Sequence, residues 1–484
     1  MRNALMTMLA GVLMLWAAAP VRAIVDPRSV ANNRFGIHIV DEGDLERAAE
    51  LVNSNGGAWG YVTVVMRADD RNREKWQRTF ERMRELKLIP IVRLATSVEG
   101  GVWKKAAYTD LDEVRNWVEF LNSLGWVVKN RYVVLFNEPN HAKEWGATIS
   151  PDEYAKTVRV YHDFLKAASA DFFILPAGMD LAASKTPVTM AANDYWKGMY
   201  RADPDVFKLF DGFVSHSYPN PGFSGSVWER GQRSVRGFEW EVDYLRGYGL
   251  ADNLPVFITE TGWAHSEGVG RPSRGYLNSA VVADNLKTAF TSIWDQSNIV
   301  AVTPFILNYQ DVPFDNFSWT RPGGGETYPQ YQAVAELPKT RGQPEQVFAG
   351  EAVQGYLPDT LATKSEYKVA LKFLNTGQAI WEDKNVEVRL SGQYDRERVS
   401  VEQVATAKPG QVARVWLDIK TTENEERMSV AAVLWRGDRA LSSPISYEMA
   451  VRKPTLLIRI KLLIEKLLNQ QDLVGNESKT EARD

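Results

Sequence analysis

Eight short apolar runs alternate with longer amphipathic stretches between about residues 34 and 308. Such alternation is typical of repeated strand and helix units that build a parallel sheet. Eight units over roughly 300 residues favour a closed (β/α)8 (TIM) barrel over an open doubly wound sheet, which more often carries an early glycine-rich phosphate turn. We therefore expect an α/β fold with such a barrel at residues 24–345. Its strands are expected at residues 35–39, 60–66, 89–94, 132–136, 172–175, 212–216, 256–259 and 299–306.

Two of the intervening stretches carry clear helix signals. One has apolar residues at helical spacing, which predicts a single buried face. The other is Ser-Pro-Asp-Glu at residues 150–153, which predicts a capping box with proline at the first helical position. The apolar residues of the first stretch are Trp76, Phe80, Met83 and Leu86.

The pattern changes after about residue 350 to short strands in which apolar and polar side chains alternate. Turn signals at residues 375–377 and 409–410 support a small antiparallel sandwich. The Asn-Thr-Gly turn at 375–377, followed by Trp381, resembles immunoglobulin-like modules of exported proteins. We expect an all-β sandwich at residues 350–452. On its clearest strand, Tyr367, Val369, Leu371 and Phe373 share one face, and Lys368 and Lys372 share the other.

The two ends of the chain carry targeting and surface signals. Arg2, the apolar run after it and a small-residue site at 21–23 predict an export signal over residues 1–23. An uncleaved membrane anchor is the alternative, but the run is shorter than the ~20 residues of a membrane span. Residues 453–484 predict a basic amphipathic helix and a polar tail. That helix either packs on the folded chain or makes a peripheral membrane contact.

Composition excludes several classes of partner. A net charge of -4 gives no electrostatic reason to expect nucleic acid. The absence of cysteine excludes disulfides and thiolate metal sites, and the five histidines lack ligand-like spacing, so we expect no metal or other cofactor. The 16 tryptophans and 18 tyrosines suit a carbohydrate ligand, because aromatic faces stack on sugar rings.

Two glutamates follow strands on opposite sides of the expected barrel. The fourth run ends in Asn137-Glu138-Pro139, and the seventh ends at Glu260. Side chains at the carboxyl ends of strands four and seven converge above the barrel centre. Two facing carboxylates can cleave a glycosidic bond, and a separation of about 5 to 5.5 Å selects the retaining, covalent route.

These motifs resemble the signature of the clan A glycoside hydrolases, over about residues 34–337. The resemblance implies that Glu138 is the general acid/base and Glu260 the nucleophile. It also implies that Asn137 binds the substrate 2-hydroxyl. In strand eight this sequence lacks the tryptophan that many members carry at its end, and Phe305, Tyr309 or Trp319 are the possible substitutes.

Other candidate residues close the expected strands. His216 and Tyr218 share one face at the end of strand six, where the clan often carries such a pair, and the tyrosine is expected to orient the nucleophile. An arginine is expected beside the nucleophile, and the two candidates are Arg67 and Arg93. The remaining candidates for sugar binding are His38, which closes strand one, and Trp145 and Trp263, which follow the two glutamates as stacking platforms.

The sequence thus predicts an exported retaining glycoside hydrolase that acts on a β-linked oligosaccharide or polysaccharide. The compartment is the periplasm, the cell surface or the extracellular space. Two alternatives stay open. One is a barrel that only binds polysaccharide, and the other is a transglycosylase or processing enzyme for exopolysaccharide, which uses the same chemistry with a sugar as acceptor.

Overall fold

The computed structural model describes residues 24–353, 357–382, 385–456 and 460. The expected export signal at 1–23 lies outside the described residues, and so does most of the expected helix and tail at 453–484. Within the described ranges, every helix is too short or too polar to cross a membrane. We refer to residues 24–345 as the α/β region and to residues 346–453 as the β region.

The α/β region contains two parallel sheets, one of five strands in the order β1-β2-β3-β6-β7 and one of three strands in the order β10-β9-β8. A helix follows each of these strands along the chain. The strands are β1 (Gly36–His38), β2 (Gly60–Arg67), β3 (Leu88–Ala95), β6 (Arg131–Val134), β7 (Phe172–Leu175), β8 (Phe213–Ser215), β9 (Val256–Ile258) and β10 (Ile299–Val302). The helices are α1 (Leu45–Val52), α2 (Arg73–Glu85), α3 (Leu111–Ser123), α4 (Pro151–Ala168), α5 (Ala192–Ala202), α6 (Gly237–Arg246), α7 (Ser279–Thr288) and α8 (Pro329–Ala335).

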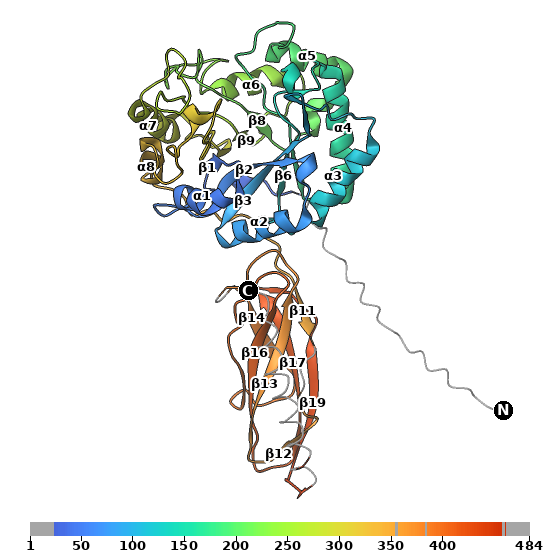
Figure 1. Ribbon diagram of the computed structural model, residues 1–484. Helices are drawn as coiled ribbons and strands as arrows, with labels where there is room; N and C mark the ends of the chain where they lie inside the picture. The colour runs from blue at the N-terminus through green and yellow to red at the C-terminus, as the bar shows by residue number, and fades with distance from the viewer. Residues whose placement is uncertain (1–23, 354–356, 383–384, 457–459, 461–484) are drawn as a thin grey trace, which may run out of the picture.

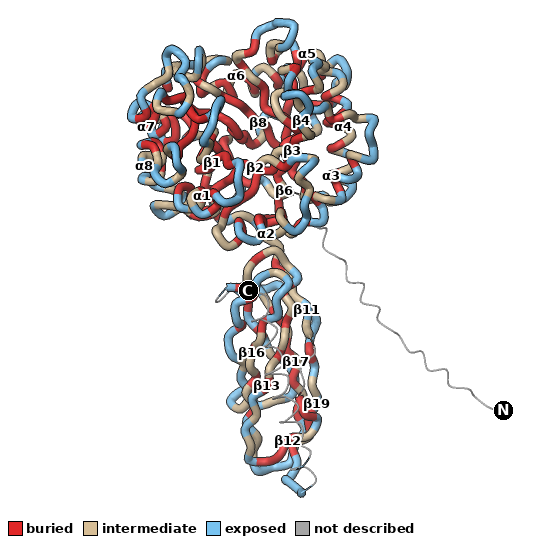
Figure 2. Tube along the Cα trace, viewed as in Figure 1, coloured by how far each residue is buried: buried red, intermediate tan, exposed pale blue. Residues whose placement is uncertain are grey.

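Isolated bridges join the two parallel sheets at both edges. Phe35 pairs with Val302 between the first and last strands, and Asp180 pairs with His216 beyond β7 and β8. Figure 1 shows the strands in the middle of this region with the helices around them. Strands enclosed in this way are buried on both faces, which explains their continuous apolar runs and the buried centre in Figure 2.

Two local expectations need correction. The fourth strand was expected to reach residue 136, but β6 ends at Val134 because Phe136 takes a positive φ of 72°, which no strand accommodates. Helix α4 begins at Pro151 as expected, but the capping box does not form. The Ser150 hydroxyl donates to Asp152 Oδ1 at 2.9 Å instead of capping a backbone N–H. The apolar face predicted for α2 is confirmed, with Trp76, Phe80 and Met83 buried.

The β region consists of two mostly antiparallel sheets, in the orders β11-β13-β16-β15 and β12-β19-β17-β14. Burial alternates along β13 as the sequence predicts, with Val369, Leu371 and Phe373 buried. Buried Asn375 donates to the carbonyls of Ala379 and Ala407, which fixes the turn before buried Trp381. The strands are β11 (Gly350–Val353), β12 (Thr360–Ala362), β13 (Glu366–Asn375), β14 (Glu387–Ser391), β15 (Val399–Val401), β16 (Val412–Lys420), β17 (Glu426–Arg436), β18 (Arg439–Ala440) and β19 (Ile445–Arg452).

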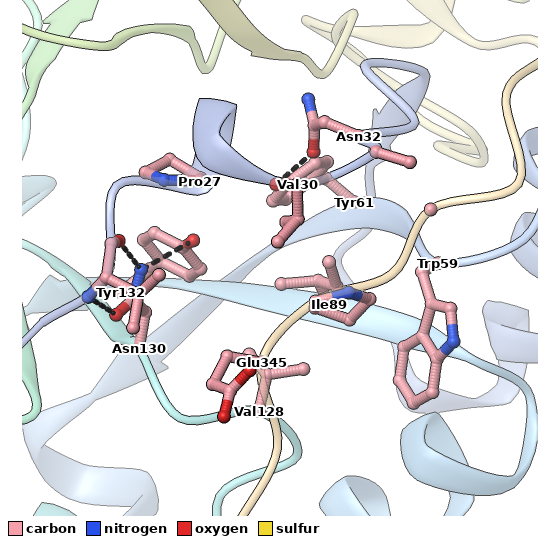
Figure 3. Close-up of a pocket in the computed structure, with 14 residues that line it drawn as sticks. Pro27, Val30, Asn32, Trp59, Tyr61, Ile89, Val128, Asn130, Tyr132 and Glu345 are labelled. Atoms are coloured by element: carbon pink, nitrogen blue, oxygen red, sulfur yellow. Dashed lines mark hydrogen bonds between the residues drawn. The ribbon is translucent and has the colours of Figure 1, made fainter.

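The chain closes the amino ends of the parallel strands with its own first described residues (Figure 3). Val25 exchanges two hydrogen bonds with the side chain of Asn130, at 2.9 and 2.7 Å. The Tyr61 hydroxyl donates to Asn32 Oδ1 at 2.7 Å. The β region attaches at this same end, where Gln378 Nε2 donates to the carbonyl of Val128. The carboxyl ends of the strands are therefore left free of the β region.

Candidate active site

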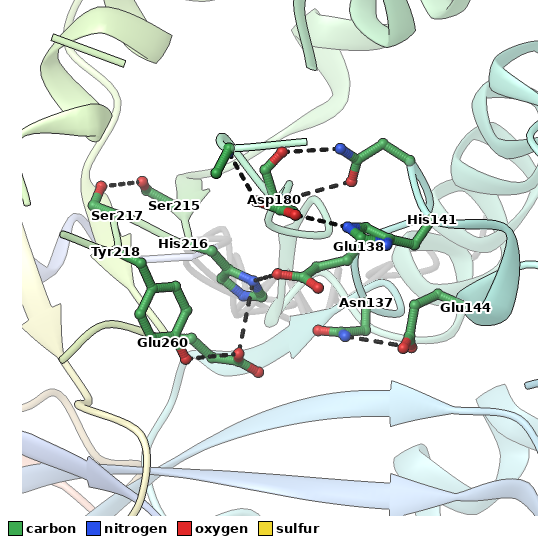
Figure 4. Close-up of polar contacts among 12 residues, drawn as sticks. Asn137, Glu138, His141, Glu144, Asp180, Ser215, His216, Ser217, Tyr218 and Glu260 are labelled. Atoms are coloured by element: carbon green, nitrogen blue, oxygen red, sulfur yellow. Dashed lines mark hydrogen bonds and ion pairs between the residues drawn. The ribbon is translucent and has the colours of Figure 1, made fainter. Parts of the chain in front are cut away.

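Glu138 stands on a strained turn directly after β6. Phe136 and Glu138 have positive φ angles of 72° and 29°, a region that non-glycine residues adopt only where the surroundings hold them. The backbone N–H of Glu138 donates to the carbonyl of Gly178, at 3.1 Å, in the loop after β7. This contact fixes the turn, so the carboxylate is directed by the backbone toward the centre of the site (Figure 4).

Glu260 lies two residues after β9 and is 8% exposed. Arg93 Nη1 lies 3.2 Å from its Oε1, and the Tyr218 hydroxyl donates to its Oε2 at 3.3 Å. His216 Nδ1 is 3.8 Å from Oε2. Burial raises the pKa of Glu260, but the charges of His216 and Arg93 and the Tyr218 hydrogen bond outweigh it and hold the pKa below its usual value. Glu260 is therefore a carboxylate kept ionised inside the protein.

His216 links the two carboxylates. Its Nδ1 lies 3.0 Å from Glu138 Oε1, and the dashed lines of Figure 4 connect it to both glutamates. One side-chain ligand atom each of Glu138, His216 and Glu260 lies within 4.8 Å of the other two. Burial lowers the pKa of His216, but the charge of Glu260 and the hydrogen bond to Glu138 reverse this and raise it. The two carboxylates thus face each other at close range.

Three ligand atoms at this spacing are a geometry that can hold a metal ion. The surroundings oppose a divalent cation, because the guanidinium of Arg93 already pairs with Glu260 at 3.2 Å. A second full positive charge at the same carboxylate would meet strong repulsion in a buried setting. The donor set is better explained as two carboxylates with their own protein partners.

The remaining members of the site surround this pair. His38 is buried, with Nε2 at 3.9 Å from Glu260 Oε1, and burial lowers the pKa of His38 to about 3, so it is a neutral imidazole. Asn137 Nδ2 donates to Glu144 Oε2 at 3.4 Å. Burial, followed by the charge of Glu260, raises the pKa of Tyr218, which therefore keeps its proton as a donor.

The expectation that Arg67 lies beside Glu260 is wrong, since Arg93 takes that place. Arg67 is the last residue of β2, and its side chain points outward, 47% exposed and paired with Asp69. Its guanidinium also lies 5.9 Å from the centre of the Trp103 ring. Arg67 therefore lies at the rim of the site, and Arg93 lies at its centre. Arg93 pairs with Val65, and Arg67 pairs with Ala95, so both arginines lie on the same face of the sheet. Arg67 reaches the rim because it stands two residues further along.

Trp145 and Trp263 do not offer open stacking platforms. Trp145 is 1% exposed and packs edge-on against Phe136 and Tyr154. Trp263 is 2% exposed, and its Nε1 donates to the carbonyl of Gly225 at 2.8 Å. Both side chains belong to the large hydrophobic core. Both follow the strand ends that carry the two glutamates, but their burial excludes stacking of a sugar on either ring face.

Aromatic side chains that are partly exposed gather elsewhere, at the carboxyl ends of β8, β9 and β10. Phe305 packs edge-on against His38 with ring centres 5.2 Å apart, next to Glu260. Trp319, the third possible substitute for the missing strand-eight tryptophan, is buried in the core. This aromatic cluster, separate from the main core, comprises Tyr218, Phe223, Tyr276, Phe305, Tyr309 and Phe317 with Ala264 and Ile306.

Sequence reasoning missed three polar groups around the site. Glu144 lies beside Asn137, and burial followed by the charge of Glu138 raises its pKa. His141 Nε2 lies 2.8 Å from Asp180 Oδ2, behind Glu138. Glu241, fully buried on α6, accepts a hydrogen bond from Ser215, and burial raises its pKa to about 8. His141 and Glu144 follow Glu138 within six residues of the sequence, which indicates that they lie near it. Nothing in the sequence marks the burial of Glu241.

The site is thus a pair of facing carboxylates, with Arg93 on one side and the aromatic cluster on the other.

No protein-family model and no curated protein matches this sequence. Solved structures similar to it include a β-mannanase from Alicyclobacillus acidocaldarius and a β-glucosidase from Exiguobacterium marinum, each 13% identical with a TM-score of 0.37. The alignments cover 64% and 61% of this chain and 98% and 85% of those chains.

A β-glucuronidase from Bifidobacterium dentium is 10% identical, with a TM-score of 0.39, and the alignment covers 63% of this chain and 46% of that one. These three structural neighbours are glycoside hydrolases. Because their TM-scores lie below 0.5, we draw the function of this chain from the geometry of its site.

Proposed function

We propose that this chain is a retaining glycoside hydrolase, with Glu138 as general acid/base and Glu260 as nucleophile. The observation that carries the proposal is the distance between the two carboxylates, whose nearest oxygens lie within 4.8 Å. Retaining enzymes hold their carboxyl groups about 5 to 5.5 Å apart, whereas inverting enzymes leave about 6.5 to 9.5 Å for a water. The short separation supports the covalent route.

The surroundings of the two carboxylates support this division of roles. A nucleophile must be ionised, and Glu260 has an arginine, a tyrosine hydroxyl and a histidine around it. A general acid must gain and lose a proton, and Glu138 has a single close ionisable partner among the described residues, His216. The more strongly charge-stabilised carboxylate is therefore assigned to attack and the other to proton transfer.

The reaction then proceeds by double displacement. Glu260 attacks the anomeric carbon while Glu138 gives its proton to the departing glycosidic oxygen, which leaves a glycosyl ester on Glu260. In the second half, Glu138 takes a proton from water as the water oxygen attacks the same carbon and releases Glu260. The backbone strain at Glu138 fits a residue held in place for this exchange.

We also propose that the fold predicted from the sequence is the fold that carries this site. The bridges at both sheet edges support a closed (β/α)8 barrel at residues 24–345, and the two-sheet β region supports an immunoglobulin-like sandwich at 350–452. Export with removal of residues 1–23 remains part of the proposal. The substrate is a β-linked oligosaccharide or polysaccharide.

The test is the stereochemistry of the product. The purified protein is incubated with a panel of 4-nitrophenyl β-glycosides and β-linked polysaccharides, and the first-formed anomer is followed by proton NMR. We expect release of a β-anomer that later equilibrates. Formation of the α-anomer first would contradict the retaining mechanism, and no cleavage across the panel would contradict the hydrolase.

A further inference from the structure

A small pocket opens beside Asn137, on the β3 and β6 side of the two carboxylates. We call it the Glu144 pocket. It has a volume of about 20 Å³, room for roughly one water-sized group, and is partly open to solvent. This size suits a single hydroxyl group and not a whole sugar ring. Its polar and aromatic lining comprises Arg93, Thr96, Trp103, Lys104, Phe136, Asn137, Glu144 and Trp145, and the ammonium of Lys104 is paired with Glu99.

Three buried polar atoms of this lining have no hydrogen-bond partner among the described residues. They are Nε of Arg93, Oδ1 of Asn137 and Nε1 of Trp145. Trp145 is 1% exposed, so its N–H is cut off from bulk water. Leaving a buried donor or acceptor unpaired costs about 1 to 3 kcal/mol, and three such atoms around one pocket point to a ligand that completes them.

The carboxylate of Glu144 adds an under-used acceptor to the same pocket. Its closest donor is Asn137 Nδ2 at 3.4 Å, and Lys143 Nζ lies 3.8 Å away. Its side chain is only 10% exposed. Residues that line the pocket therefore carry two unpaired N–H donors, an unpaired amide oxygen and a carboxylate with one long hydrogen bond.

This mixture of donors and acceptors selects among ligands. A uronate carboxylate only accepts, so it would leave Asn137 Oδ1 unmet and face the charge of Glu144. An ammonium only donates, so it would leave the N–H groups of Trp145 and Arg93 unmet. A sugar hydroxyl donates and accepts at once, which satisfies both kinds of lining atom.

We propose that the Glu144 pocket binds one hydroxyl of a neutral sugar, on the ring whose anomeric carbon faces Glu260. Arg93 and Asn137 line the pocket and also border the two carboxylates, which places the pocket within reach of that ring. The hydroxyl donates to Glu144 or Asn137 Oδ1 and accepts from Trp145 Nε1. Glu144 and Trp145 are therefore specificity residues that favour neutral glycosides over uronides. This inference rests on the proposed function.

The test couples a change in the protein to a change in the substrate. Wild type, Trp145→Phe and Glu144→Gln are assayed on the best-cleaved neutral 4-nitrophenyl glycoside and on its 2-, 3-, 4- and 6-deoxy analogues. We expect wild type to lose 10- to 100-fold in kcat/KM with one analogue, because a site built for a hydroxyl rejects the sugar that lacks it. Each variant should lose about tenfold in kcat/KM with the unmodified glycoside, and replacing that glycoside by the same deoxy analogue should then cost little more.

Two matched variants control for general effects of the substitutions. Trp381→Phe removes another buried, unpartnered indole N–H, but in the core of the β region. Glu113→Gln neutralises a half-buried carboxylate on α3 that pairs with Arg71. Both should keep the wild-type deoxy penalties. Thermal unfolding of every variant separates misfolding from lost recognition.

The outcomes separate this inference from the proposed function. If wild type cleaves glycosides but Trp145→Phe and Glu144→Gln retain its full deoxy penalties, the pocket assignment is overturned and the hydrolase stands. The same holds if wild type prefers the glucuronide to every neutral glycoside. If wild type cleaves no glycoside at all, the proposed function itself fails.

Discussion

The two ends of the parallel strands handle buried polar groups in opposite ways. At the amino ends, the side chains of Asn130 and Tyr61 pair with the first described residues, Val25 and Asn32. At the carboxyl ends, within the same described ranges, neither ring nitrogen of His38 has a hydrogen-bond partner, and the Trp145 N–H has none. Pairing is not complete at the amino ends, where Nε of Arg131 also lacks a partner, but the groups left unpaired at the carboxyl ends lie around the two carboxylates, at a cost in stability.

Backbone strain occurs at both ends. Trp59 and Lys87, directly before β2 and β3 at the amino ends, have positive φ angles of 61° and 55°. The positive φ angles of Phe136 and Glu138 lie at the carboxyl end, directly after β6. Strained backbone and unpaired polar atoms each cost of order 1–3 kcal/mol and persist only where the surrounding packing holds them. The two ends therefore differ in how fully their buried side chains are paired, and not in backbone strain. The predictions below test this contrast.

The largest effect is expected for the two carboxylates. Glu260→Ala removes the nucleophile, so activity should fall by several orders of magnitude with every leaving group. Glu138→Ala removes the proton donor, so an aryl glycoside with a good leaving group should still form the glycosyl-enzyme, with a burst followed by slow turnover. Stopped-flow absorbance at the nitrophenolate band measures both.

Added azide separates the two roles. Azide needs no general base, so it should accelerate Glu138→Ala and give a β-glycosyl azide from a β-linked substrate. With Glu260→Ala only the α-azide can form. Equal losses in both variants on all leaving groups, without rescue by azide, would show that the roles are misassigned.

A pH effect on stability is expected from Glu241, behind the carboxyl end. Burial raises the pKa of Glu241 to about 8 in the folded protein, against 4.5 as the ordinary value. Between these two values the folded state keeps a proton that the unfolded state has lost, so the stability contribution declines as pH rises from about 4.5 to 8. The slope is at most about 1.4 kcal/mol per pH unit.

The Glu241→Gln variant mimics the protonated acid, so its free energy of unfolding should no longer decline with pH through Glu241. Denaturant unfolding at a series of pH values measures this decline. Glu239→Gln on the same helix, where the side chain is partly exposed and pairs with Arg236, is the control and should keep the slope. Identical slopes in wild type and Glu241→Gln would show that Glu241 is ionised in the folded protein.

A smaller loss of stability, without loss of activity, is expected at the amino end. Asn130→Ala removes both hydrogen bonds to Val25 and one to Tyr132, so the free energy of unfolding should fall by about 2 kcal/mol. The kcat/KM of the folded protein should not change. Urea unfolding and a glycosidase assay measure the two quantities.

Asn122→Ala provides the comparison, because Asn122 is an exposed residue that accepts a hydrogen bond from Arg131. Its loss should cost less than about 0.5 kcal/mol. A large fall in kcat/KM for Asn130→Ala would mean that the two ends of the strands are coupled and would break the contrast between them.

The smallest effect is expected on removal of residues 453–484. The described chain leaves β19 at Arg452, in the β region, whose contacts with the α/β region lie at the amino ends of the strands. Hydrolysis of small glycosides should therefore be unchanged. A truncated protein with a native melting temperature and a strongly reduced kcat would contradict this.

Periodic features of the chain were predictable because burial enforces them. The eight apolar runs coincide with the parallel strands β1, β2, β3, β6, β7, β8, β9 and β10 within a few residues, and the alternation along β13 follows its burial. Strand ends were less predictable. The turn at Phe136 depends on contacts with the loop after β7, which no local pattern records.

Site residues at strand ends were predictable to the extent that strand geometry directs them. Glu138, Glu260, His216 and Tyr218 do converge. Arg67 and Arg93 lie on the same face of the sheet, so the choice between them depends on how far along its strand each one stands. The burial of Trp145 and Trp263 depends on how the loops fold over them, so an aromatic residue near a strand end did not reveal whether its face was open.

The attachment of the β region at the amino ends has a consequence for how the molecule can be tethered. Strand β13 runs for 10 residues toward the junction, at about 3.3 Å each, so its first residue lies at the far end, roughly 30 Å from the junction. Arg452 pairs with Thr363 at that far end, so the described chain departs there. A molecule anchored through its C-terminal segment would hold the face with Glu138 and Glu260 turned outward, with the β region as a spacer.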